Sequence, residues 1–355
     1  MSHFIVPPYL LQHLTTVEDP EWASVADAAR RSLALDGPMR GARAVRPGET
    51  PPTTVPRTAA PGRARQLLDP ERTIFDAQGT ETLPGVVVRS EGDPQSDDIA
   101  VTEAYDGLGH THALFRDAFG RASIDDDNLP LLGTVHFGQD YENAFWDGER
   151  MVFGDGDGMV FVRFTASLSV IGHELAHGVT QYTANLRYQG QSGALNESVS
   201  DVFGAMVEQY ALGQTVDEAS WLIGEGLFTD RVQGSALRSM IAPGTAYDDD
   251  VLGKDPQPAS MADYVDTKDD NGGVHINSGI PNRAFCLAAT AIGGRSWEGA
   301  GHIWYDSLVS GQIRADTDFT GFAIATITAA NDRFGAGSSE AQAVGEAWTT
   351  VGVEV

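Results

Sequence analysis

The sequence predicts an α+β protein that has a β-rich N-terminal part and an α-helical C-terminal part. Residues 70–166 contain short runs of Val, Thr and Phe broken by Gly and Asp, a pattern typical of twisted β structure. From residue 167 to residue 355 apolar residues recur at helical spacing instead. The pentad His173-Glu174-Leu175-Ala176-His177 lies just after this change. The most informative motif of the chain therefore lies where the two parts meet.

The elements can be placed along the chain in order. A short amphipathic helix is expected near the N-terminus, with Trp22, Val25, Ala28 and Leu33 on one side. Residues 38–65 are rich in Pro, Arg and Thr and have no apolar period, which predicts a flexible linker. The later helices are expected over 113–119, around the pentad, where a loop enters a helix within 193–201, and over 284–292, 302–310, 322–333 and 339–351.

Composition and charge narrow the classes of partner. The chain has 355 residues, enough for two or three domains with a sizeable core. Its formal net charge of −27 argues against nucleic acids and anionic membranes as partners, and no apolar run reaches the length of a membrane span. Cys286 is the only cysteine, so no internal disulfide forms, and its apolar neighbours predict a buried thiol. We expect a monomer in solution.

The pentad has the geometry of a metal site. Residues four apart on an α-helix are separated by about 40° around its axis, so the imidazoles of His173 and His177 point the same way. Two neutral imidazoles can hold Zn²⁺, and Glu174 beside them can act as general base toward a metal-bound water. A catalytic zinc has three protein ligands and one open position, and Glu197 is the candidate third ligand. Two surface histidines on a polar helix would give the same pattern.

A second carboxylate accompanies Glu197. Asp201 lies four residues further along and falls on the same helical face. One of the two carboxylates can bind the metal while the other accepts a hydrogen bond from the far nitrogen of a ligand histidine, which fixes the tautomer of that ring. In so acidic a chain, a solvated acidic face is the alternative.

Several motifs together identify a family. Residues 173–204, HELAHGVTQYTANLRYQGQSGALNESVSDVFG, resemble the zinc-site segment of the thermolysin-like metallopeptidases. The resemblance continues in residues 143–146, 154–158, 237–240 and 270–279, and covers roughly residues 70–355. It implies a thermolysin-like fold in which the zinc cleft lies between a β-rich domain of residues 70–166 and an α-helical domain of residues 167–355.

The resemblance implies a chemical role for each matching position. The residues that would bind the metal or act on the amide are His173, His177 and Glu197 as zinc ligands, Glu174 as general base, and Tyr188 and His275 as oxyanion donors. Asp270 would orient His275, and Asp201 would hold His173. Without the family, Tyr188 would be read as a packed aromatic. Gly272 and Gly273 predict an exposed turn beside His275.

The resemblance also implies how a peptide is held. Asn143 and the backbone of Ala144 match groups that bind the substrate main chain, and Arg238 matches the side chain that binds the carbonyl on the leaving side, although a structural salt bridge is its alternative. The pocket for the side chain after the cut bond would favour Leu, Phe, Ile or Val, and Phe164 would make it shallower. Its matching residues, which are otherwise ordinary core, are Phe161, Phe164, Val170, Ile223, Leu227 and Leu237.

The N-terminus differs from the rest of the chain. Residues 1–14, MSHFIVPPYLLQHL, have no basic leader and are interrupted by Pro7-Pro8, so no secretory signal is expected, and the protein would be cytoplasmic or exported by a non-classical route. This start resembles that of protealysin-like precursors, which carry a short propeptide with a Pro-Pro-Tyr element. The resemblance implies that residues 1–50 are an intramolecular inhibitor and that cleavage falls in the linker. Residues 51–69 would contain the rest of the linker and the start of the mature enzyme. A folding aid or a disordered tail is the alternative.

The sequence departs from the family at the calcium sites. Glu208 and Glu225 match two carboxylates of the double calcium site of thermolysin. Ca²⁺ requires six to eight oxygen ligands, so loss of the other acidic ligands predicts that the double site is absent or reduced to one weak ion. The positions without their acidic ligand are Ser169, Ser220, Leu222 and, at a further site, Ser235. Asp155 and Asp157 are expected in a tight polar turn.

Two functions remain open from the sequence. The first is a zinc endopeptidase, made as a zymogen, that cuts peptides and proteins before large hydrophobic residues. The second is a protein-binding relative that keeps the same fold but has lost catalysis. All the chemical positions match in this sequence, which favours the first.

Overall fold

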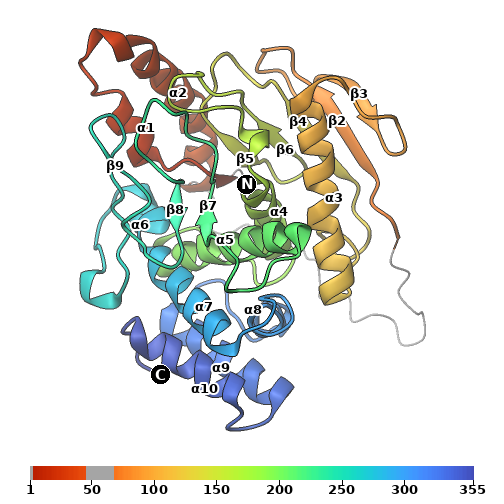
Figure 1. The fold of residues 1–355 in the computed structure, drawn as a ribbon, viewed down its shortest axis with the longest axis vertical. Helices are drawn as coiled ribbons and strands as arrows, with labels where there is room; N and C mark the ends of the chain where they lie inside the picture. The colour runs from red at the N-terminus through yellow and green to blue at the C-terminus, as the bar shows by residue number, and fades with distance from the viewer. Residues whose placement is uncertain (1–2, 45–67) are drawn as a thin grey trace.

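The computed structural model describes residues 3–44 and 68–355 (Figure 1). The first described segment, residues 3–44, is here called the leader. It contains β1 (His3–Phe4), α1 (Pro8–Leu14), a 3₁₀ turn (Pro20–Trp22) and α2 (Ala23–Ala44). The prediction that a linker begins at residue 38 was wrong, because α2 continues through Pro38 to Ala44. A proline has a φ compatible with a helix, and the turns of α2 before it are held by buried Val25, Ala29 and Ser32. The rest of the predicted linker, residues 45–65, lies outside the described residues.

One mixed sheet spans the N-terminal part. It has the strand order β1-β5-β6-β4-β2-β3, in which β2 pairs with β4, and β4 with β6, in parallel. The remaining pairs are antiparallel. The strands after β1 are β2 (Arg72–Asp76), β3 (Val86–Ser90), β4 (Leu131–Val135), β5 (Ala144–Trp146) and β6 (Met151–Phe153). The leader thus contributes a strand to the sheet of the catalytic part.

A long helix packs beside this sheet. Helix α3 (Ile99–Phe119) begins well before the predicted residue 113, at an N-cap formed by Asp98, whose carboxylate accepts from the backbone N–H groups of Ala100 and Val101. It ends at Gly120, which adopts the left-handed conformation favoured by glycine at helix ends. The predicted helix was too short because the sequence analysis did not identify Asp98 as an N-cap.

The C-terminal part is helical, as predicted. Its helices are α4 (Leu168–Gln181), α5 (Gly190–Leu212), α6 (Asp270–Asn277), α7 (Gly279–Ile292), α8 (Ala300–Val309), α9 (Phe319–Phe334) and α10 (Ser339–Thr350). Residues 193–201, expected as a loop that enters a helix, all lie inside α5. Helix α9 begins three residues before its predicted start because Asp318 caps it by accepting from the N–H of Gly321. Short hairpins pair β7 (Leu222–Ile223) with β8 (Arg238–Ser239), and β9 (Asp248–Asp249) with β10 (Gly253–Lys254).

Helices α4 and α5 cross closely, and two glycines make this possible. A Cβ on Gly204 would lie 2.4 Å from the carbonyl oxygen of Ser169, and one on Gly172 would lie 3.0 Å from the Cα of Gly204. Any side chain at Gly204 would therefore force the two helices apart. The close crossing brings the face of α5 that carries Glu197 and Asp201 against the pentad on α4.

The apolar core continues from the leader into the catalytic part. Ile5, Leu10 and Leu11 belong to the same buried cluster as Val170 on α4 and Leu237 beside β8. Packing of this extent contradicts the alternative that the leader is a disordered tail. Cys286 is buried, as predicted, and its burial raises the pKa of the thiol to about 12.

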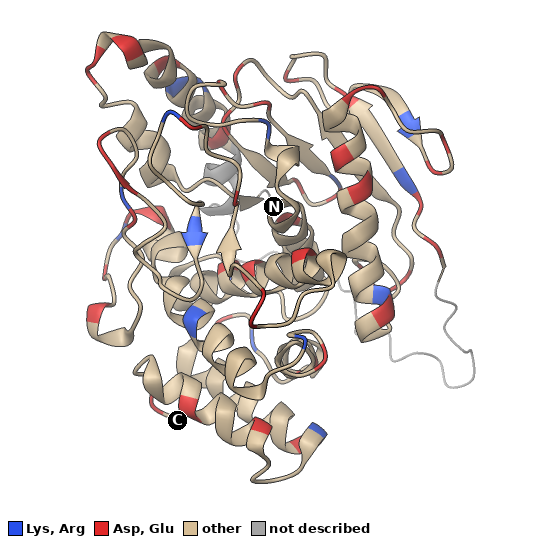
Figure 2. Ribbon diagram, in the orientation of Figure 1, with Lys and Arg blue, Asp and Glu red and all other residues tan. Residues whose placement is uncertain are grey.

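Acidic side chains are spread over most elements and outnumber basic ones (Figure 2). Among the described residues, none of the helices combines the length and the apolar character needed to cross a membrane.

Candidate active site

Helix α4 presents His173, Glu174 and His177 in the interior, all at 1 % exposure or less. Nδ1 of His173 lies 2.7 Å from a carboxylate oxygen of Asp201, which can only accept, so this nitrogen carries the proton. Nδ1 of His177 lies 2.8 Å from Oδ1 of Asn196, and the amide of Asn196 is oriented by its donation to the carbonyl of Leu186. Both rings therefore direct the lone pair of Nε2 into the site. The sequence reading missed Asn196, although its place directly before Glu197 on α5 was a usable signal.

The two Nε2 atoms lie 3.0 Å apart, too close for two acceptors with nothing between them. The carboxylate of Glu197 lies 3.5 Å from each of them. Two lone pairs and a negative charge directed at one point fit a bound cation. Two imidazoles and one carboxylate are also the donor set of catalytic zinc sites that keep a fourth position open. The residues that the sequence predicted as zinc ligands thus converge and fit that metal.

Tyr188 and His275 lie side by side at the same site. The hydroxyl of Tyr188 donates to the carboxylate of Glu197 and lies 3.1 Å from Nε2 of His275. Nδ1 of His275 lies 2.6 Å from Asp270, whose other carboxylate oxygen accepts from the backbone N–H of His275 at 2.8 Å. Positive φ values from Asp270 to Gly273 turn the chain so that this carboxylate faces the ring. Asp270 therefore holds the proton on Nδ1 and fixes the ring in place.

The prediction that His275 lies in an exposed turn was wrong, because its side chain is fully buried. The glycines before it do form a turn, but the leader covers the ring: Nε2 of His275 lies 3.1 Å from the carbonyl oxygen of Phe4.

Arg238 and Asp201 form a buried ion pair behind the pentad. Nε and Nη2 of Arg238 donate to the two carboxylate oxygens of Asp201 at 2.9 and 2.8 Å, and Asn282 donates to the same carboxylate at 2.7 Å. Burial alone would raise the pKa of Asp201, but Arg238 and His173 lower it far below its usual range. Arg238 also donates to the carbonyl of Ile5 at 3.1 Å. It therefore makes both the structural salt bridge and a main-chain contact.

The leader lies along the edge of β5 in an extended conformation. In β1, His3 is in register with Trp146 and Phe4 with Phe145. The N–H of Ile5 then donates to the carbonyl of Ala144 at 3.1 Å, and the N–H of Val6 donates to Oδ1 of Asn143 at 2.9 Å. The groups that the sequence predicted to hold a substrate main chain hold the leader in this structure.

The residues predicted to form the specificity pocket are all buried in one apolar cluster, which also includes Ile5. None exceeds 2 % exposure. These residues are Phe161, Phe164, Val170, Ile223, Leu227 and Leu237.

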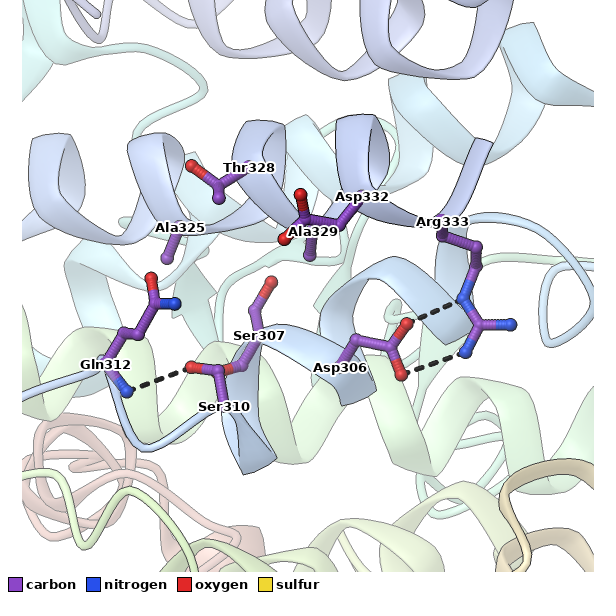
Figure 3. A pocket seen from close by; sticks show the side chains of 9 residues that line it. All are labelled: Asp306, Ser307, Ser310, Gln312, Ala325, Thr328, Ala329, Asp332 and Arg333. Atoms are coloured by element: carbon purple, nitrogen blue, oxygen red, sulfur yellow. Dashed lines mark hydrogen bonds and ion pairs between the residues drawn. The ribbon is translucent and has the colours of Figure 1, made fainter. Parts of the chain in front are cut away.

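A separate depression of about 400 Å³ lies between α8 and α9 (Figure 3). Arg333 spans it with two contacts to Asp306, at 2.6 and 2.9 Å. The other side chains lining it, such as Thr328 and Gln312, are small or polar, and no histidine reaches it. This depression is not part of the active site.

The predicted polar turn at residues 154–158 is present. A carboxylate oxygen of Asp157 accepts from the backbone N–H groups of Met159, Val160 and Phe161 at 2.8–3.1 Å.

At the calcium positions, burial raises the pKa of Glu208 and the nearby charge of Glu225 raises it further, whereas hydrogen bonds with Ser169 lower it. Loss of the double calcium site stays a prediction.

His136 joins the polar turn to the start of α3. Its ring lies 2.9 Å from Asp98 and 2.9 Å from Asp155. The hydrogen bond to Asp155, opposed by burial and helped by Asp98, raises the pKa of His136 to about 9. Because this folded pKa is raised, the ring stabilises the fold fully below its unfolded pKa of about 6.5. That stabilisation declines as the pH rises to about 9 and is lost above it.

The change His136→Asn tests whether the charged ring of His136 stabilises the fold through Asp98 and Asp155. Asn is suitable because it tolerates the positive φ at this position. We expect the variant to melt about 1–3 °C below the wild type near pH 6 and at the same temperature near pH 10. Melting temperatures of both proteins across this range, with exposed His110→Asn as the control, provide the measurement. A difference in melting temperature that stays constant with pH would contradict stabilisation by the charged ring.

The buried histidines and Glu197 form a cluster that could hold a metal ion, and comparisons with known proteins give the family of the chain. The family model described as the thermolysin metallopeptidase catalytic domain matches residues 57–181, and the model of its alpha-helical domain matches residues 184–353. The chain belongs to the thermolysin metallopeptidase family, which confirms the predicted family, fold class and enzyme class.

Individual relatives agree with this assignment. The chain is 58 % identical over 284 residues to an extracellular metalloprotease of Pectobacterium carotovorum subsp. carotovorum, covering 80 % of this chain and 81 % of that protein. It is 44 % identical to protease PrtS of a Photorhabdus strain, covering 99 % and 92 %. A solved structure, the precursor of the metalloproteinase protealysin from Serratia proteamaculans, superposes with a TM-score of 0.86 at 50 % identity, covering 99 % and 100 %. The last match supports a precursor that carries a propeptide.

Proposed function

We propose that this chain is the zymogen of a zinc-dependent neutral endopeptidase that cuts peptides and proteins on the N-terminal side of Leu, Phe, Ile or Val. The observation that carries the proposal is the convergence of His173, His177 and Glu197 beside Glu174 in the interior of the protein. When bound, zinc supplies Lewis acidity and water activated near neutral pH.

The side chains around this site divide the remaining chemistry. Glu174 is held by the backbone N–H of Trp146, which donates to its carboxylate at 2.9 Å. In this position Glu174 accepts the proton of the attacking water and passes it to the leaving nitrogen. Tyr188 donates a hydrogen bond to the carbonyl oxygen as negative charge develops on it. Nε2 of His275 does the same when the ring carries a second proton, whose charge the carboxylate of Asp270 balances.

The substrate is bound as an added strand on β5. Asn143 and Ala144 offer main-chain partners on the strand edge, and Arg238 binds a carbonyl on the leaving side, as each does for the leader. The apolar cluster around Val170 and Leu237 favours a large hydrophobic side chain after the cut bond.

The propeptide, residues 1–50, acts as an intramolecular inhibitor that is removed by cleavage in the linker. Support comes from the leader, which uses the partners that a substrate needs and buries the site. The match of all the chemical positions in the sequence argues against the catalytically silent alternative.

One experiment tests the metal and the propeptide together. Cleavage of a Leu-containing peptide is measured with the full chain and with a chain starting near residue 51, before chelation, after it, and after zinc is added back. We expect the shorter chain to be at least about tenfold faster, because a tethered inhibitor acts at an effective concentration in the millimolar range. We also expect chelation to abolish cleavage reversibly. Equal rates from two folded chains would refute the inhibitory role, and cleavage that survives metal removal would refute the zinc mechanism.

A further inference from the structure

The leader lies in the active site with the direction and register of a substrate. In chain order, the Phe4 carbonyl lies 3.1 Å from Nε2 of His275, and the N–H of Ile5 donates to Ala144 at 3.1 Å. The Ile5 carbonyl then accepts from Arg238 at 3.1 Å, and Val6 exchanges two hydrogen bonds with the side chain of Asn143, at 2.9 and 3.4 Å.

These contacts identify one peptide bond. The proposed oxyanion donor holds the Phe4 carbonyl, while the groups of the leaving side hold Ile5 and Val6. Ile5, a large hydrophobic residue, is fully buried in the same apolar core as the residues predicted to form the specificity pocket. The Phe4–Ile5 bond therefore occupies the place of the bond to be cut, which raises the question of what protects it in the precursor.

The side chain of His3, the residue before Phe4, gives an answer. The ring of His3 stacks on the ring of His177, with centroids 4.0 Å apart and planes 17° apart, and meets Tyr188 edge-on at 4.7 Å. A ligand atom of His3 lies within 4.8 Å of those of His177 and Glu197, and all three residues are buried. Pairing of β1 with β5 holds residue 3 in this position. A third imidazole thus lies beside two members of the ligand set, His177 and Glu197.

We propose that His3 is the fourth protein ligand of the catalytic metal in the precursor, and that it thereby protects the Phe4–Ile5 bond. Imidazole is a good zinc ligand, and its attachment to the leader makes binding intramolecular. With His3 in the fourth position, the site lacks room for the water that hydrolysis requires. Removal of the leader would then withdraw both the covering chain and this ligand. The inference rests on the proposed function, because it requires the zinc site.

The first test measures the ligands of the bound metal and does not depend on activity. X-ray absorption of the zinc-loaded full chain should show three imidazole ligands in the wild type and two in His3→Phe, a change that keeps a ring for stacking but removes the ligand nitrogens. The visible spectrum of the Co²⁺-loaded protein should change in the same variant. Exposed His13→Phe, also in the leader, should match the wild type in both measurements. Two imidazoles in the wild type, or identical spectra for His3→Phe, would show that His3 only packs against the site.

The second test measures whether the Phe4–Ile5 bond is cleaved. After zinc loading, the intact mass of the wild-type chain should retain residues 1–4, whereas His3→Phe should lose them. Hydrolysis adds the hydroxyl of water to the Phe4 carbonyl carbon and a proton to the Ile5 nitrogen as the bond between them breaks, leaving Ile5 as the new N-terminus. The double variant His3→Phe/Glu174→Gln should stay intact. Loss of residues 1–4 from the wild type, or their retention in His3→Phe, would overturn the protective role.

These results are distinguishable from a failure of the proposed function itself. If the chain starting near residue 51 cleaves an added peptide, the zinc mechanism stands whatever the imidazole count of the precursor. If that chain binds zinc and is inactive, the proposed function fails independently of His3.

Discussion

Replacing Glu174 with glutamine in the matured enzyme should lower kcat/KM by about 10²- to 10⁴-fold, the range found for a positioned general base. Glutamine has nearly the same shape and can still accept the N–H of Trp146, which lies 2.9 Å from the carboxylate in the wild type. It cannot take a proton from water at neutral pH. The loss should therefore fall on the chemical step and leave folding and zinc content unchanged.

Three measurements separate this loss from trivial causes. Zinc content by elemental analysis and the melting temperature should match the wild type, while kcat for a Leu-containing peptide falls. Glu149→Gln is the matched control, because Glu149 lies on a nearby turn and its side chain is 78 % exposed. Retention of wild-type kcat in a zinc-loaded Glu174→Gln enzyme would show that another group moves the proton.

The part of the site that the sequence predicted consists of local patterns on regular elements. His173 and His177 are four apart on one helix, as are Glu197 and Asp201 on the next, so helical geometry alone orients each pair. The helices of the C-terminal part were predicted because each buries one apolar face, and the spacing of that face is visible in the sequence. Their starts were misplaced where a cap such as Asp318 determines the first turn.

The features that the sequence did not predict depend on contacts between distant segments. The N–H of Val6 and the side chain of Asn143 are 137 positions apart in the chain, and no local pattern indicates that the leader adds a strand to the sheet. Burial of His275 follows from the same contact, since its turn is covered by Phe4. The role of Asn196 depends on where α4 and α5 cross, which Gly172 and Gly204 set.

The buried pair of Arg238 and Asp201 connects the stability of the fold to the geometry of the site. Both side chains are at most 1 % exposed, and Asp201 also holds Nδ1 of His173. Removing one partner leaves an uncompensated charge in the interior, which costs far more than losing an exposed pair. Misplacement of His173 would follow, because its ring orientation depends on that carboxylate.

Arg238→Met in the full chain should therefore lower the free energy of unfolding by about 3–5 kcal/mol. The matched control is Arg314→Met, whose side chain is 81 % exposed beside Asp316 and which should change stability by less than about 0.5 kcal/mol. Denaturant unfolding of the wild type, both variants, Asp201→Asn and the double variant Asp201→Asn/Arg238→Met completes a cycle. We expect the double variant to lose about 1–3 kcal/mol less than the sum of its singles, because neither charge is then left alone. Additive losses would mean that the two side chains stabilise the fold independently, through Asn282 and the leader instead of through each other.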